Sequence, residues 1–374
     1  MEIIRDIKSK IQKNLFKGKV IVIYGARRVG KTFLVKQLLK EHSGGRYINC
    51  ELLQNKLLLQ TTNSEKLKDI IGDKKLIILD EAQTINDIGL ILKIMADTFP
   101  EVQIIATGSS SFDLSGKITE PLTGRIRTYI LYPFSLNEIK QVYAQPELNA
   151  RIENILRFGL YPEVYKRGEE SAIEEVNELA SNYLYKDILQ YQNIKKPELV
   201  INLLRALALQ IGSEVSVHEL AGLLKQNSHT ISRYLEILEK CFVIFRLSAF
   251  SRNLRNEITK NQKIYFYDTG IRNSLIQNFN SMDLRTDKGA LWENFCIIER
   301  LKFLENSRKY VNKYFWRTYN QQEIDYIEEY GGKLYAYEFK YGKKPGKVPP
   351  LWNKNYSGYE FQHVNPDNFN QFLK

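Results

Sequence analysis

Three stretches in the first third of the chain are rich in β-branched apolar residues, and each ends in polar residues. The stretches are KVIVIY at 19–24, KKLIILD at 74–80 and VQIIATG at 102–108. Continuous apolar runs of this length are typical of strands that are buried on both faces of a parallel sheet. Because ligands of an open α/β sheet bind beyond the carboxyl ends of its strands, the residues that follow each run are candidates for a binding site.

The first run leads into a glycine-rich loop, GARRVGKT from Gly25, and the loop leads into a helical pattern. The glycines let backbone N–H groups wrap phosphates, and the helix N-terminus adds a partial positive charge. Lys31 would reach the β- and γ-phosphates, and the Thr32 hydroxyl would bind Mg²⁺. A glycine-rich turn without a ligand is the alternative. The residues expected to bind ATP are Gly25, Ala26, Arg27, Arg28, Val29, Gly30, Lys31, Thr32 and Phe33.

The second and third runs end in groups that suit nucleotide hydrolysis. Asp80 could bind Mg²⁺, and Glu81 could align the attacking water. Thr107 or Ser109, at the end of the third run, could sense the γ-phosphate. Two acids in a surface turn are the alternative, but solvation alone does not explain why they end a wholly apolar strand. An ATPase of the AAA-plus type requires acids and a polar group at these positions.

Two arginines follow this region in the segment TGRIRTYILYPFSLNEI at 123–139. Arg125 or Arg127 could act as an arginine finger across a subunit interface, which would require a homo-oligomer. A solvated arginine on a strand is the alternative. The sequence leaves both roles open, and with them the oligomeric state.

Composition and charge are those of a globular protein in a reducing compartment. The 374 residues are 43% hydrophobic and 26% charged. Cys50, Cys241 and Cys296 form no CxxC pair, which excludes a disulfide framework and a structural zinc site. The segment MEIIRDIKSK has no apolar signal core, and no apolar run approaches the roughly 18 residues of a membrane span. We therefore expect a soluble, cytoplasmic protein that does not enter a membrane.

Changes in pattern predict three further domains after the nucleotide-binding region. Polar residues around Pro146 indicate a boundary, and helical patterns interrupted by FGLYPE at 158–163 indicate a helical lid that ends at Pro197. The next three helical patterns and two strands resemble a winged helix, and a long helix followed by strands predicts an α+β domain. The expected domains are an α/β P-loop core at 1–145, a helical lid at 146–197, a winged helix at 198–270 and a C-terminal domain at 271–374.

The segment that resembles a winged helix carries a basic loop between its two strands. The net charge of the chain is +11, and between 240 and 263 six basic residues accompany one acid, Glu257. A third helix followed by a basic wing is how such domains grip DNA, so we expect DNA as a partner. A protein-binding surface is the alternative, because Glu236 and Glu239 interrupt the positive face. The helix residues are Ser228, His229, Ser232 and Arg233, and the basic residues are Lys240, Arg246, Arg252, Arg255, Lys260 and Lys263.

The segment EIDYIEEYGGKLYAYEFKY at 323–341 reads as a β-hairpin with two facing carboxylates. Its alternation favours strands, and its glycine pair is a two-residue turn signal. This register places Asp325 opposite Glu338 and Glu323 opposite Lys340, although like charges destabilise facing positions. Mg²⁺ would remove that repulsion, and the lysine could then position a metal-bound water for attack on a phosphodiester. A Glu323–Lys340 ion pair on an exposed hairpin is the alternative.

Taken together, these segments resemble a bacterial and archaeal family of AAA-plus-type P-loop ATPases. The resemblance implies that the loop from Gly25 to Thr32 binds ATP and that Asp80 and Glu81 serve Mg²⁺ and water. It also implies that Thr107 or Ser109 is the sensor. The matching motifs are YGARRVGKT, LIILDEAQ, ATGSSS, TGRIRTYILYPFSLNE, YFYDTGIRN, GALWENF, EIDYI and YEFK.

Members of this family carry a C-terminal domain of unknown function that is similar to PD-(D/E)xK nucleases. The similarity places Glu293, from a predicted helix at 287–304, in a metal site with Asp325 and Glu338, and Lys340 beside the attacking water. Ile324 stands where the nuclease signature has a proline. Two functions follow: an ATP-dependent nuclease or DNA remodeller, and a nucleotide-dependent switch whose nuclease-like domain is an inactive scaffold that binds DNA or protein partners.

Overall fold

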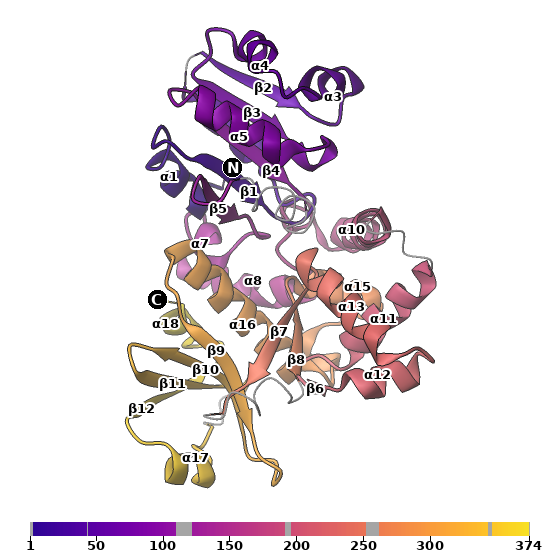
Figure 1. Ribbon diagram of the computed structural model, residues 1–374. Coiled ribbons are helices and arrows are strands. Elements are labelled where there is room, and N and C mark those ends of the chain that lie inside the picture. The colour runs from indigo at the N-terminus through magenta and orange to yellow at the C-terminus, as the bar shows by residue number, and fades with distance from the viewer. Residues whose placement is uncertain are drawn as a thin grey trace. The chain divides into compact units, whose positions relative to one another are not determined.

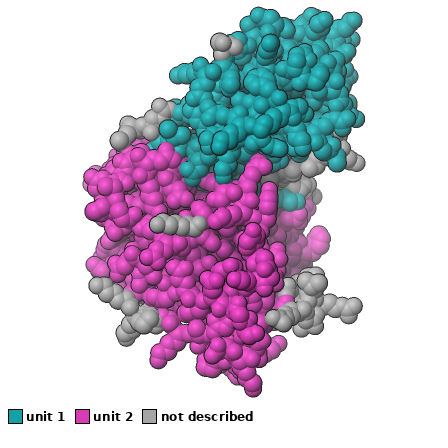
Figure 2. Space-filling model, turned by 90° about the vertical axis from the view of Figure 1, so that its left-hand side faces the viewer, with its two compact units in different colours: residues 1–134, 240–242 teal, residues 135–239, 243–374 magenta. Residues whose placement is uncertain are grey.

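The chain divides into two compact units (Figure 2). The second unit contains the ranges expected as lid, winged helix and C-terminal domain, except for 240–242. Because this division does not separate those three ranges, the four expected domains stay a prediction. The units are 1–134 with 240–242, and 135–239 with 243–374. The computed structural model describes residues 3–42, 44–109, 122–190, 196–251, 262–342 and 346–373.

The first unit is built on a five-stranded sheet with the strand order β2-β3-β4-β1-β5 (Figure 1). All four neighbouring pairs are parallel. Every residue of β1, β3 and β4 is buried, as the continuous apolar runs predict for central strands of a parallel sheet. The strands are β1 (Val20–Tyr24), β2 (Gly45–Asn49), β3 (Leu76–Asp80), β4 (Gln103–Gly108) and β5 (Ile126–Ile130).

Helices pack against this sheet and against one another. The helix after the glycine-rich loop, α2, contacts β2, β3 and β4, and it buries Leu34, Val35 and Leu38. The helix α4 packs against α5. The helices are α1 (Asp6–Gln12), α2 (Lys31–Lys40), α3 (Leu53–Leu59), α4 (Ser64–Ile71), η1 (Ala82–Thr84) and α5 (Ile88–Thr98).

The second unit contains a seven-stranded mixed sheet with the order β12-β11-β10-β9-β7-β8-β6. Strand β7 pairs in parallel with β9, through Ser248 with Tyr314 and Ala249 with Phe315. One sheet therefore joins strands that the sequence analysis assigned to separate winged-helix and C-terminal domains. The strands are β6 (Glu214–Val215), β7 (Ile244–Ala249), β8 (Gln262–Phe266), β9 (Asn312–Arg317), β10 (Glu323–Tyr330), β11 (Lys333–Phe339) and β12 (Tyr359–Val364).

A long helix, α16, lies along this sheet and contacts β8 and β11 (Figure 1). It is the helix that the sequence predicts at 287–304, and it extends to Ser307. The helices of the unit are α7 (Leu136–Ile139), α8 (Gln145–Phe158), α9 (Pro162–Tyr165), α10 (Glu169–Gln190), α11 (Pro197–Leu209), α12 (Val217–Leu223), α13 (Ser228–Lys240), α15 (Thr269–Leu275), η2 (Met282–Leu284), α16 (Lys288–Ser307), α17 (Pro350–Asn355) and α18 (Phe369–Phe372).

The short helix α15 fastens α8 to the rest of the second unit through the motif DTGIRN. The buried Asp268 carboxylate caps α15 by accepting from the Ile271 N–H at 3.1 Å, and it also accepts from the Leu160 N–H at 2.7 Å. The Asn273 amide donates to the last carbonyls of α8, including that of Leu156 at 2.9 Å. A Cβ on Gly270 would overlap the Phe158 carbonyl, so only glycine permits this approach.

We expect Gly270→Ala to destabilise the protein by about 1–3 kcal/mol, because the added methyl group meets backbone that cannot rotate away. Gly222→Ala is the matched control, since this glycine also lies in a helix but faces open space. The control should be unchanged or more stable by up to about 1 kcal/mol. Urea denaturation followed by circular dichroism measures both, and equal midpoints for the two variants would contradict the packing described.

Candidate functional site

The glycine-rich loop connects β1 to α2 and is shaped by residues with positive φ. Gly25 has φ +157° and Gly30 has φ +96°, and a Cβ on Gly25 would overlap the Leu131 carbonyl. Arg28 has φ 59° without being glycine, a conformation that costs energy and that occurs at binding sites. Arg5 anchors the loop, because its guanidinium donates to the Val29 carbonyl at 2.7 Å.

The Lys31 side chain is buried inside this loop. Its ammonium donates to the carbonyls of Gly25 and Ala26, each at 3.0 Å, and lies 3.7 Å from a Glu81 carboxylate oxygen. The side chain is 3% exposed. The structure therefore gathers a lysine ammonium and the loop backbone at one point, as the sequence predicts for a phosphate-binding loop.

The Asp80 carboxylate lies at the end of β3 and accepts hydrogen bonds from three hydroxyl groups. Thr32 donates at 2.7 Å, Tyr47 at 2.6 Å and Thr107 at 2.5 Å. The residue is 2% exposed, so these bonds compensate for the water that the carboxylate has lost. They also join α2, β2 and β4 to β3, which brings three predicted site residues together. Tyr47 was not predicted, because a tyrosine within a strand pattern gives no signal of its own.

Glu81 follows Asp80 and has the left-handed φ of 54°. Its N–H donates to the Thr107 hydroxyl at 2.9 Å, so both acids depend on one threonine. The Gln83 side-chain amide donates to the Glu81 carboxylate at 2.6 Å and to the Ser109 hydroxyl at 3.2 Å. The Gln83 Oε1 atom is buried and has no hydrogen-bond partner among the described residues. Gln83 was missed in the sequence, although it belongs to the motif DEAQ.

Burial and the nearby acids shift the pKa values of two other groups. Burial, the hydrogen bond to Asp80 and the charge of Asp80 raise the pKa of Tyr47 above its usual range. Burial, with smaller effects of Asp80 and Glu81, raises the pKa of the Cys50 thiol to about 12. At neutral pH the tyrosine is therefore a hydrogen-bond donor, and the cysteine is an unreactive thiol.

The donors at this site fit Mg²⁺. The Thr32 hydroxyl and the Asp80 carboxylate are hard oxygen ligands 2.7 Å apart, and Mg²⁺ typically binds one or two carboxylates together with water and substrate phosphates. The described residues contain no group of three or more His, Cys, Asp or Glu side chains that could hold a metal by themselves. A magnesium ion here would therefore depend on the nucleotide for part of its coordination.

The other residues predicted around the nucleotide lie farther away or face outward. Phe33 is exposed on the first turn of α2. Arg125 and Arg127 lie at the start of β5, which runs parallel to β1. They are therefore near the amino-terminal ends of these strands, whereas the glycine-rich loop follows the carboxyl end of β1. Arg125 forms an exposed ion pair with Asp97 at 2.6 Å. An arginine finger from this position stays a prediction, and it would have to act on another subunit.

The C-terminal hairpin has the predicted register from Tyr326 to Tyr330. Gly331 and Gly332 form the turn, both with positive φ, and Tyr330 pairs with Lys333. The ladder to β11 ends at Tyr326, and pairing of β10 with β9 shifts register between Ile324 and Ile327, which marks a β-bulge around Asp325. The bulge places the Asp325 carboxylate where it accepts from the Phe339 N–H at 2.8 Å.

The ion pairs of this hairpin differ from the expected Glu323–Lys340 pair. The Lys340 ammonium binds the Glu338 carboxylate at 2.6 Å, and Glu323 lies beside Arg317 of β9 instead of facing Lys340. The exposed Glu323–Lys340 pair is therefore absent. Burial raises the pKa of Asp325 well above its usual range, and the charges of Glu293 and Glu338 raise it further.

The cation beside these acids is a lysine side chain of the protein itself. The Lys263 ammonium, on β8, forms ion pairs with Glu293 at 2.9 Å and with Glu323. Lys263 is 1% exposed, so it is not the DNA-contacting wing residue that the sequence analysis expected. With an ammonium between the carboxylates, the residues present do not fit a divalent metal at this position.

The exposed face of α13 retains residues expected to contact DNA. His229, Ser232 and Arg233 are exposed on it, together with Glu236. Arg246 instead pairs with Glu239. Three basic residues expected in the wing lie outside the described residues, namely Arg252, Arg255 and Lys260.

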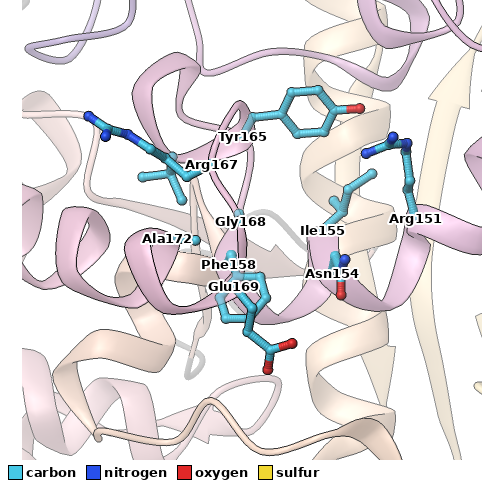
Figure 3. Close-up of a pocket in the computed structure, with 11 residues that line it drawn as sticks. Arg151, Asn154, Ile155, Phe158, Tyr165, Arg167, Gly168, Glu169 and Ala172 are labelled. Carbon is cyan, nitrogen blue, oxygen red and sulfur yellow. The ribbon is translucent and has the colours of Figure 1, made fainter.

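A separate cavity of about 100 Å³ lies in the second unit between α8, α9 and α10 (Figure 3). It is too small for a nucleotide. Its charged lining residues bind neighbouring side chains: Arg167 pairs with Glu175 at 3.1 Å and Glu169 with Arg157. Nothing in this cavity points to a ligand.

Comparisons with known proteins agree with the loop and strand geometry. A family described as "AAA domain" matches residues 17–140, and two described as domains of unknown function match 149–282 and 288–348. The Walker-type ATPase PABY2304 of Pyrococcus abyssi has a similar fold, with a TM-score of 0.51 and 18% identity, covering 74% of this chain and 96% of that one. None of the described helices is long and apolar enough to cross a membrane.

Relatives are found in bacteria and archaea. The uncharacterised protein Rv2008c of Mycobacterium tuberculosis is 27% identical over 91% of this chain and 74% of its own length. The uncharacterised protein MJ1544 of Methanocaldococcus jannaschii is 30% identical over 86% of this chain and 74% of its own length. The chain therefore belongs to the same family as this archaeal protein, and its residues 17–140 are similar to the family described as "AAA domain".

Proposed function

We propose that the protein binds and hydrolyses ATP with Mg²⁺ and that it works as a nucleotide-dependent switch. The observation that carries this proposal is the hydrogen-bonded group around Asp80, which joins the end of β3 to Thr32 of the loop helix and to Thr107 of β4. In this proposal, Thr32 responds to the nucleotide and Thr107 responds to the γ-phosphate. Both donate to the same buried carboxylate, that of Asp80.

Each residue has a separable role in the proposed reaction. Lys31 would exchange its two loop carbonyls for the β- and γ-phosphates, and Thr32 and Asp80 would hold Mg²⁺, which neutralises phosphate charge when bound. Glu81 would orient the attacking water and accept its proton. Gln83 would hold the Glu81 carboxylate in place and report the state of Ser109.

The second unit is the proposed output of the switch. Helices α11, α12 and α13 with strands β6, β7 and β8 have the element order of a winged helix, which supports the proposal that α13 contacts DNA. The buried Lys263 ammonium favours a nuclease-like domain that acts as a scaffold over one that cleaves DNA. A Mg²⁺-dependent deoxyribonuclease is the competing function.

Lys31→Ala should abolish ATP binding because the phosphates lose their main cationic contact. Glu81→Gln should keep the affinity for ATP but lower kcat by about 10²–10⁴-fold, because the amide cannot accept the proton of water. Steady-state ATPase rates and titration with a fluorescent ATP analogue measure both effects. Lys40→Ala, an exposed lysine on the same helix, should behave as wild type. An unchanged ATPase rate in Lys31→Ala or Glu81→Gln would refute the assignment.

Gln83→Ala should lower kcat by roughly 10–100-fold, the equivalent of one hydrogen bond to a charged group, while KM for ATP stays the same. The physical reason is that Glu81 loses the donor that orients it. Gln12→Ala is the matched control, since Gln12 makes a similar bond to Glu41 on the surface of the same unit. If both variants retained wild-type kcat, Gln83 would have no positioning role.

Arg233→Ala should weaken binding to all duplex sequences alike and reduce the salt slope by about one, as expected for one lost phosphate contact. Arg167→Ala, which removes an exposed arginine that pairs with Glu175, is the control and should bind as wild type. Fluorescence anisotropy with duplex DNA at several salt concentrations gives both quantities. No duplex affinity at about 50 mM salt would eliminate the DNA proposal.

The same preparations distinguish the scaffold from the nuclease. Supercoiled plasmid should stay intact with Mg²⁺ or Mn²⁺, with and without ATP. Nicked circles that disappear in Asp325→Asn would instead establish the competing function.

A further inference from the structure

The Lys263 side chain is a buried cation that the proposed ATPase chemistry does not use. It lies on β8, which pairs with β7 through Leu247 and with β6 through Glu214. Both neighbouring strands therefore hold its backbone, and its side chain is 1% exposed. An ammonium is costly to bury unless carboxylates surround it, so the residues around it must supply negative charge.

The required charge comes from α16 and β10, which are distant from β8 in the sequence. Lys263 lies 2.9 Å from Glu293 of α16 and forms an ion pair with Glu323 of β10. Burial by itself lowers the pKa of Lys263. The charges of Glu293, Asp325 and Glu323 outweigh burial and raise this pKa above its usual range. Two of these acids, Glu293 and Asp325, are residues that the sequence analysis placed in a metal site, whereas Glu323 is not.

A second residue of β8 takes part in this arrangement. Tyr265 is two residues from Lys263, so both side chains point to the same side of the strand. Its hydroxyl donates to Glu293 at 2.6 Å, on the same carboxylate oxygen that accepts from Lys263. Lys263 and Tyr265, from one face of the strand, therefore both donate to this oxygen of the Glu293 carboxylate.

We propose that the Lys263 ammonium takes the place of a divalent cation among Glu293, Glu323 and Asp325, so that this domain is held together by a buried ion pair instead of by a metal. The lysine fastens β8 to α16 and to the bulged part of β10. The acids keep the negative charge of a cation site, and the tethered ammonium occupies that site in place of a free cation. This inference rests on the scaffold part of the proposed function and is independent of ATP hydrolysis.

Removal of the lysine should therefore create a metal-binding site. Lys263→Met should lower Tm by on the order of 10 °C, because it leaves carboxylates buried without a counter-charge. Millimolar Mn²⁺ should raise the Tm of this variant more than that of wild type. Melting curves are recorded without nucleotide, so that any Mn²⁺ bound at Thr32 and Asp80 contributes equally to all variants.

Lys302→Met is the matched control. Lys302 is another buried lysine. Its ammonium lies 2.6 Å from Glu299, which is not one of the acids that pair with Lys263. This variant should also melt lower than wild type, and Mn²⁺ should restore none of the loss. Equal Mn²⁺ effects on Lys263→Met and Lys302→Met would overturn the proposal.

Two further comparisons keep the proposal falsifiable if Lys263→Met folds poorly. The double variant Lys263→Met with Glu293→Gln should melt higher than Lys263→Met alone, because it removes one unpaired carboxylate; an equal or lower Tm would overturn the proposal. Wild type and Asp325→Asn should show the same Mn²⁺ shift. A Mn²⁺ shift in wild type that Asp325→Asn abolishes would mean that a metal displaces the lysine, and the proposal would be wrong.

Discussion

The candidate nucleotide site depends on the burial of one carboxylate, that of Asp80. A carboxylate that is 2% exposed requires hydrogen bonds to replace its water, and hydroxyl groups from α2, β2 and β4 provide them. The order of the strands makes this possible, because β4 lies between β1 and β3 and brings Thr107 to the same edge. Hydrogen bonds therefore connect the helix after the loop, the two acids and β4.

The second unit is organised by buried charges in the same way. Asp268 caps α15 and accepts from Leu160, which fixes the turn after α8. Lys263 is enclosed by acids of α16 and β10. Its sheet includes strands from the predicted winged-helix and C-terminal domains. Breaking such a pair costs more than the pair contributes, since the remaining charge stays buried. These charges therefore restrict how the strands and helices of the unit can be arranged.

The sequence predicted more of the nucleotide site than of the hairpin site. Lys31, Thr32, Asp80 and Thr107 are identified by where they fall relative to apolar strands, because a parallel sheet brings its strand ends to one edge. Tyr47 and Gln83 were missed because their roles depend on which strand lies beside β3 and on the left-handed turn at Glu81. Lys263 was misassigned to a solvent-exposed wing. The sequence around a basic residue near a loop does not show whether its side chain is exposed or buried.

The sequence by itself determined the local elements: the buried strands, the glycine-rich loop, the long helix and the hairpin register, all of which follow from periodicity and turn chemistry within short segments. Only the tertiary structure decided which acids meet which cations. The parallel pairing of β7 with β9 brings residues 66 positions apart into one sheet, and the bulge near Asp325 turns that carboxylate toward the Phe339 N–H. Such long-range partners depend on strand order and burial, and neither leaves a signal within a local segment.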